Sequence, residues 1–195
     1  MPGAMIHLAV GRAFDADASG LFYVGNLAPD FTDERAIKSV IHLRSAPDRE
    51  VALRELCGKL DLENAFELGW LLHLFADWRW DSSVVPAFHE GFTGGEDKWF
   101  LAYRAELGRL SRSMFHNEPW RREVWERIDA EDVQAALSDM RKVTPVLPVP
   151  LELGWYCNRV ERRHAMDFDA SPELFTAEMA LEFAEETAGT FKRWL

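Results

Sequence analysis

The stretch from Gly69 to Asp81 constrains the fold most, because it is almost wholly apolar and yet contains a histidine and an aspartate four residues apart. That spacing places His73 and Asp77 on one face of a helix, one turn above the other. The neighbouring side chains leave this helix without a polar face, so we expect it to run through the core. A buried carboxylate is costly unless a cation or hydrogen-bond donors meet it. The pair therefore indicates either a metal site or a buried hydrogen bond between histidine and aspartate.

Length and composition are those of an ordinary globular domain. The chain has 195 residues, of which 48% are hydrophobic and 28% charged, so we expect residues 1–195 to form a single domain. Acidic residues outnumber basic ones by 33 to 22, which disfavours binding to duplex nucleic acid through its phosphates. The only cysteines, Cys57 and Cys157, do not form a CxxC motif, which argues against a thiolate zinc site. No apolar run reaches the roughly 20 residues of a membrane span, and the first residues lack a secretory signal pattern. We therefore expect a cytoplasmic protein; the sequence carries no signal for its oligomeric state.

Apolar residues recur at helical intervals along most of the chain, which predicts an all-α fold. The central helix should span about residues 61–80, capped by Asp61, and the segment 82–95 should form a long connection that serves as a lid or mouth. Residues 21–27 can be either a short strand or a buried helix. Other helices are expected over residues 3–14, 32–43 with Thr32 as its cap, 47–58, 96–114, a short stretch after Pro119, 129–142, 151–165 and 172–194, with a proline-rich linker at 144–150.

Inward-pointing polar residues gather in the first 77 positions of the chain. Histidines and carboxylates are the ligands that suit zinc and similar divalent ions. Three or four such ligands with one open position would hold a water molecule whose pKa the metal lowers to about 7. The residues in question are His7, Asp30, His42, His73 and Asp77.

His116 is a sixth candidate ligand with two interpretations. It follows a long amphipathic helix and could aim its imidazole at the site, or it could interact with the carbonyl groups at the helix end.

The tryptophans of the central helix also have two interpretations. Trp70, Trp78 and Trp80 are most simply core residues, but Trp78 and Trp80 could wall an apolar cleft for an acyl chain or a stacked base.

The ordered set of these residues resembles the zinc-dependent phospholipase C family. The resemblance rests on His7, the segment Gly25-Asn26-Leu27-Ala28-Pro29-Asp30, His42, and Gly69 followed by His73-x-x-x-Asp77. It is closest to small bacterial members that lack a secretion signal, and the fungal single-strand nucleases share the helical fold. The resemblance covers roughly the first 80 residues and implies a phospholipase C or nuclease type of helix bundle around the central helix.

The resemblance also implies roles for individual residues. Asp30, His42, His73 and Asp77 match the four protein ligands of one zinc, with Asp77 bridging to a second ion and His7 matching a ligand of that second ion. With two ions bound, Asp30 could double as the base that takes the proton of water, so Asp30 and Asp77 are the implied catalytic residues. The third metal of the family uses a His-x-x-x-Glu motif, which this chain lacks, and Ser83 stands where secreted members carry a further histidine. One or two ions are therefore expected.

Two hypotheses follow for function. The first is a hydrolase that uses zinc or another divalent transition metal to cleave a phosphate ester or phosphodiester, with a small-molecule or lipid substrate. The second is a non-catalytic metal-binding helical module whose aromatic pocket serves a partner or ligand. A phosphohydrolase of the His-Asp doublet kind is disfavoured, because no histidine of the chain is followed directly by aspartate.

Overall fold

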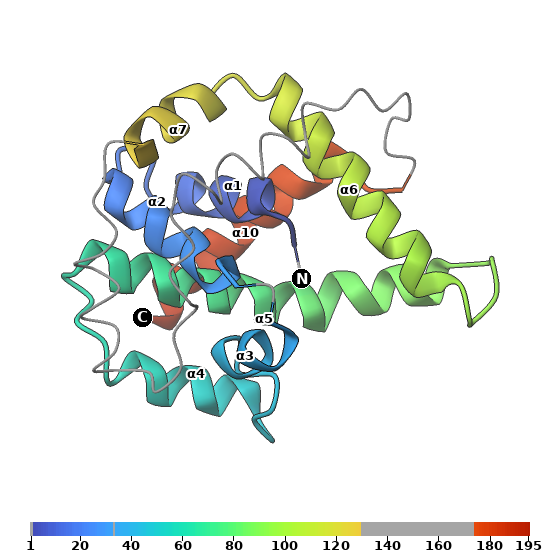
Figure 1. Cartoon of the computed structure of the whole chain (residues 1–195), viewed down its shortest axis with the longest axis horizontal. Coiled ribbons are helices and arrows are strands. Elements are labelled where there is room, and N and C mark those ends of the chain that lie inside the picture. Colours follow the sequence, from blue (N-terminus) through green and yellow to red (C-terminus); the bar gives the residue numbers. More distant parts are fainter. Residues whose placement is uncertain (1, 33, 130–173) are drawn as a thin grey trace.

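The computed structural model describes residues 2–32, 34–129 and 174–195, and within these residues it contains α-helices and no β-strand (Figure 1). The all-α prediction is confirmed. The predicted helices at 129–142 and 151–165 and the linker at 144–150 fall almost wholly outside the described residues. The described helices are α1 (Ala4–Phe14), α2 (Gly20–Leu27), η1 (Ala28–Asp30, a 3-10 turn), α3 (Arg35–Ile41), α4 (Arg49–Cys57), α5 (Ala65–Gly91), α6 (Trp99–Asn117), α7 (Arg121–Asp129) and α10 (Ala177–Trp194).

The central helix, α5, runs across the middle of the molecule, with α1, α2 and α10 on one side in Figure 1 and α3 and α4 on the other. Its cap is Asn64, whose side-chain oxygen accepts the N–H of Phe66 at 3.0 Å. The predicted cap, Asp61, lies in the preceding turn instead, where its N–H donates to Glu67 at 2.8 Å. The Glu67 carboxylate therefore fixes the entry into the helix from inside its first turn.

The predicted connection at 82–95 is wrong over residues 82–91, because α5 continues through Pro86 to Gly91. Proline in a helix interior removes one backbone hydrogen bond and usually marks a break. Packing outweighs that cost here. Phe88 is buried against Phe92, Tyr103 and Phe175, which ties this half of the helix to α6 and to the segment before α10. The central helix is thus Ala65–Gly91 rather than 61–80.

Two glycines allow α2 and α5 to cross with their backbones in contact. A Cβ atom at Gly25 would overlap the carbonyl oxygen of Phe66, and a Cβ atom at Gly69 would overlap the carbonyl oxygen of Phe22. Only glycine fits at such a close approach. The crossing also settles the segment that the sequence left open, because residues 20–27 form a buried helix capped by Ser19.

The chain then turns sharply towards the core. α2 ends at Leu27 and passes into η1, which contains Pro29 and places Asp30 at its last position. α3 begins at Arg35, later than predicted, because the Thr32 hydroxyl accepts the N–H of Glu34 and so closes a turn before the helix. It ends at Ile41, with His42 as its C-cap residue and Leu43 in the left-handed region at a φ of 55°.

The tryptophans of α5 are mainly core residues. Trp70 and Trp80 are buried, and the Trp80 indole donates to the hydroxyl of Tyr103 at 2.7 Å. Trp78 is half-buried and packs against Phe75. Among the described residues, no helix is both long and apolar enough to cross a membrane.

Candidate metal centre

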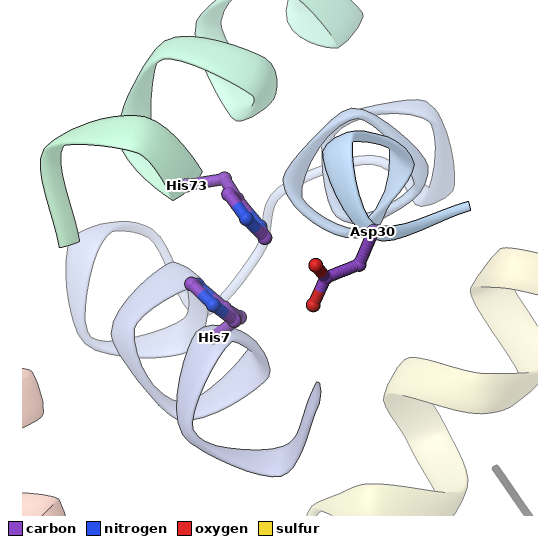
Figure 2. A group of neighbouring side chains, drawn as sticks. All are labelled: His7, Asp30 and His73. Atoms are coloured by element: carbon purple, nitrogen blue, oxygen red, sulfur yellow. The ribbon is translucent and has the colours of Figure 1, made fainter. Parts of the chain in front are cut away.

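Five of the six predicted ligands converge from four elements of the fold. His7 comes from α1, Asp30 from the end of η1, His42 from the C-cap of α3, and His73 and Asp77 from α5. The His7 and His73 rings are stacked, with centroids 3.7 Å apart, and the Asp30 carboxylate points towards them from the side (Figure 2). The three histidines and Asp77 are fully buried, whereas the Asp30 side chain is 11% exposed. Of these five side chains, that of Asp30 is the most exposed to solvent.

The protonation of two of the rings follows from their backbone contacts. His73 Nδ1 lies 2.7 Å from the carbonyl oxygen of Asn26, and His42 Nδ1 lies 2.7 Å from that of Lys38. A carbonyl oxygen can only accept, so each Nδ1 carries a hydrogen and each neutral ring keeps its lone pair on Nε2. Metal-binding histidines are typically oriented in this way, by donating the other ring nitrogen to a backbone carbonyl.

The two lone pairs face each other. His42 Nε2 and His73 Nε2 are 3.1 Å apart, which for neutral rings places two acceptors in contact. A cation between or beside them, either a proton or a metal ion, relieves the repulsion. Burial and the neighbouring His7 lower the pKa of His73 well below its ordinary value, although Asp77 acts in the opposite direction. His73 is therefore a neutral imidazole, as a metal ligand must be.

The separations between the donor atoms suit a single small ion. Ligand atoms around a tetrahedral zinc with bonds of about 2.0–2.1 Å lie about 3.3 Å from one another. His42 Nε2 lies 3.4 Å from Asp30 Oδ1 and 3.4 Å from Asp77 Oδ2, and His73 Nε2 lies 3.8 Å from the same Asp77 oxygen. Within the described chain, two overlapping groups can hold a metal ion: His42, His73 and Asp77, and His7, Asp30 and His73.

His73 belongs to both groups, and this limits the number of ions. Its Nδ1 is committed to the Asn26 carbonyl, so only Nε2 can bind a metal, and a single lone pair binds one ion. The two groups therefore describe one centre. For a second ion, the described residues leave one pair of donor atoms that the first ion does not use. These are His7 Nε2 and Asp77 Oδ1, which are 3.4 Å apart.

Several polar atoms of the centre have no hydrogen-bond partner among the residues that the structure describes. These atoms are both nitrogens of His7 and both carboxylate oxygens of Asp77. A buried carboxylate with neither a donor nor a cation close enough would be strongly destabilising. The residues thus fit a bound cation, which would satisfy acceptors that the protein itself leaves unsatisfied.

The surroundings of both aspartates favour the ionised carboxylate. Burial alone would raise the pKa of Asp77, but the contact with His7 and the neighbouring histidines hold it well below its ordinary value. Burial opposes ionisation of Asp30 in the same way, and the Lys38 ammonium, followed by His42, holds the pKa of Asp30 well below its ordinary value. The centre therefore offers two carboxylates and neutral imidazole, a donor set suited to zinc and other divalent transition metals.

The structure adds cationic residues that the sequence analysis did not identify. Lys38 Nζ lies 2.5 Å from Asp30 Oδ1, and Arg49 Nη2 lies 3.7 Å from Asp77 Oδ2. The available signal was a set of basic residues between Lys38 and Arg49 in an acidic chain, but their spacing does not follow the periodicity of a single helix.

The structure does not bring His116 to the centre. Its side chain is exposed near the end of α6, and it belongs to neither group that can hold a metal in the described part of the chain. The buried face of α6 includes Met114, and a residue two positions further on lies on the opposite side of a helix.

No protein-family model, no curated protein and no solved structure matches the chain.

Proposed function

We propose that this protein is a metal-dependent hydrolase of phosphate esters or phosphodiesters, of the kind found in the zinc-dependent phospholipase C family. The observation that carries the proposal is the pair of Nε2 atoms of His42 and His73, 3.1 Å apart and each with its other ring nitrogen held by a backbone carbonyl. Two carboxylates adjoin this pair, and together they form a site for one divalent ion, with zinc as the first candidate.

Asp30, His42, His73 and Asp77 would hold the ion. When bound, such an ion lowers the pKa of a water molecule and neutralises charge on a phosphoryl group. Asp77 directs Oδ2 towards His42 and Oδ1 towards His7, so Asp77 and His7 could also help to hold a second ion.

Asp30 is the residue proposed to move the proton. It is the most exposed member of the cluster, and the Lys38 ammonium holds its pKa well below the ordinary value. A carboxylate in that position can accept the proton of an attacking water and release it to solvent. Lys38, which contacts the same carboxylate and is 30% exposed, would limit how basic Asp30 becomes.

The alternative is a metal site that only stabilises the fold. It is supported by the complete burial of three histidines and Asp77, because structural sites are closed whereas catalytic sites keep an open position. The partial exposure of Asp30 favours the hydrolase, since it gives the centre a side from which a substrate can approach.

Hydrolysis of bis(p-nitrophenyl) phosphate by the zinc-loaded full chain separates these two functions. We expect turnover above that of free zinc at the same concentration, and a loss of about 100-fold or more in Asp30→Asn if Asp30 is the base. His89→Gln, a change at a half-buried histidine further along α5, should retain full activity. A chain that binds zinc stoichiometrically and still shows no turnover would support the non-catalytic module.

A further inference from the structure

Of the lysines and arginines in the described part of the chain, Arg49 lies closest to the buried carboxylate of Asp77. It is the first residue of α4, whose start is fixed by Asp48 accepting the N–H of Val51 at 3.0 Å. One side of its guanidinium is anchored to α5, because Nη1 donates to Asp81 Oδ2 at 2.9 Å. Asp81 also accepts from Arg44 at 3.1 Å, so this carboxylate anchors both arginines one turn beyond Asp77.

The other edge of the same guanidinium is buried, and no acceptor among the described residues hydrogen-bonds to it. Nε and Nη2 form this edge, and Nη2 lies 3.7 Å from Asp77 Oδ2, beyond hydrogen-bonding distance. Two parallel N–H groups on one edge match the oxygens of a carboxylate or phosphate. A metal ion cannot satisfy them, because they are donors. The centre thus presents unsatisfied acceptors on Asp77 and His7 beside unsatisfied donors on Arg49.

The charges around the centre also favour an anion beside the metal. Three carboxylates, those of Asp30, Asp77 and Asp81, form ion pairs with the three cations Lys38, Arg44 and Arg49. These ion-paired groups balance one another before any metal is added. Among the charges of the described residues, a divalent ion would therefore add an excess of two positive charges, and an anion next to the metal would offset that excess.

We propose that the Nε–Nη2 edge of Arg49 binds the phosphoryl oxygens of the substrate, and that the substrate is accordingly a phosphate ester anion. This inference rests on the proposed function and assigns the phosphate-binding group of the same site. Lysine would be a poor replacement, because an ammonium group lacks the paired, planar donors that match two phosphate oxygens. The segment from Lys38 to Arg49 then forms the cationic side of the centre, next to the partly exposed Asp30.

Inorganic phosphate is the probe for this assignment. Its binding to the full chain, loaded with one equivalent of zinc and freed of excess metal, is measured by isothermal titration calorimetry. We expect phosphate binding by the wild type, a loss of tenfold or more in Arg49→Gln, and a smaller loss in Arg49→Lys. Arg193→Gln removes the same charge at an exposed position of α10, where the side chain makes a local bond to Thr190, and should bind phosphate like the wild type.

Zinc content and helicity are measured on every variant. Arg49→Gln that retains its zinc and binds phosphate within twofold of the wild type would overturn the proposal, as would a zinc-loaded wild type that binds no phosphate; a buried water would then be the partner of Arg49. If Arg49→Gln fails to fold, Arg49→Lys decides, because it preserves the charge beside Asp81 and removes the two-donor edge. Binding at full strength in that variant would also overturn the proposal.

These outcomes separate the inference from the proposed function. Zinc-loaded protein that binds phosphate through Arg49 but hydrolyses no phosphodiester would refute the hydrolase and leave the anion site in place. Hydrolysis that proceeds with an unchanged KM in Arg49→Gln would refute the anion site at Arg49 and leave the hydrolase in place.

Discussion

The two halves of α5 share one continuous helical backbone but lie in different surroundings. From Phe66 to Asp77 nearly every side chain is buried, whereas from Asp81 to Gly91 most are exposed and Phe88 is the buried exception. Each half contains a histidine. His73 is fully buried among other candidate ligands, while the His89 side chain is 40% exposed and pairs with Glu96 at 2.8 Å.

The difference shows that secondary structure alone does not create a site. His89 interacts with an exposed carboxylate, and such surface pairs contribute little to stability. His73 has its tautomer fixed by the Asn26 carbonyl, which lies in the last turn of α2, where helix carbonyls lack their usual donors. The glycine crossing between α2 and α5 brings that carbonyl within reach, so the buried half of α5 is the half that can orient a ligand.

The largest effect is expected from placing a methyl group in the crossing. Gly69→Ala would press Cβ against the Phe22 carbonyl oxygen and the backbone nitrogen of Asn26, neither of which can move without shifting α2. We expect a loss of about 3 kcal/mol or more in the free energy of unfolding. Urea denaturation followed by circular dichroism measures this quantity.

The matched control lies on the exposed half of the same helix. A Cβ atom at Gly91 meets nothing within 4 Å, so Gly91→Ala should be neutral or stabilise the protein by about 0.5 kcal/mol through helix propensity. Equal effects at the two glycines would contradict the distinction between the halves.

A smaller loss of stability is expected at high pH, where Tyr23 on α2 ionises. Tyr23 is fully buried, and burial raises its pKa from the ordinary value of 10.0 to about 12, against the opposing charge of Arg127. The neutral phenol is thus favoured in the folded state. Its contribution is fully present below pH 10 and is lost as the pH rises to 12, because the unfolded chain ionises first.

The difference between the Tyr23 pKa values of the folded and unfolded chain corresponds to about 2–3 kcal/mol in the free energy of unfolding once Tyr23 is fully ionised. Tyr23→Phe should be less stable than the wild type near neutral pH by about 1 kcal/mol, since it loses the hydrogen bond to the Asp15 carbonyl. Its stability should then fall less steeply between pH 10 and pH 12. Parallel pH profiles for the two proteins would show that Tyr23 is not the group responsible.

Local patterns in the sequence predicted the buried half of α5 and the ligands on it. The four-residue spacing of His73 and Asp77 in an apolar stretch indicated both their burial and their common face, and the structure places them so. Asp30, expected from the sequence to point inward, lies at the last position of η1, directly after Pro29. Each of these inferences depended on residues close together in the chain.

What the sequence analysis missed depends on contacts between distant segments. Pro86 resembles a helix end until Phe88 is seen packed against Phe175. Arg49 has no local feature that distinguishes it from other arginines, and its role follows from its position beside Asp77 on another helix. His116 was a candidate ligand because it follows an amphipathic stretch, but its position on α6 turns it away from the buried face.

Metal content of the full chain, purified without chelator and measured by plasma mass spectrometry, tests the central claim most directly. The comparison requires the wild type, His73→Ala on the buried half of α5, and His89→Ala on the exposed half. We expect about one equivalent of zinc or another transition metal in the wild type and in His89→Ala, and little or none in His73→Ala. A wild type that contains no metal and takes up none on titration with zinc would contradict the account, and so would His73→Ala with the metal content of the wild type.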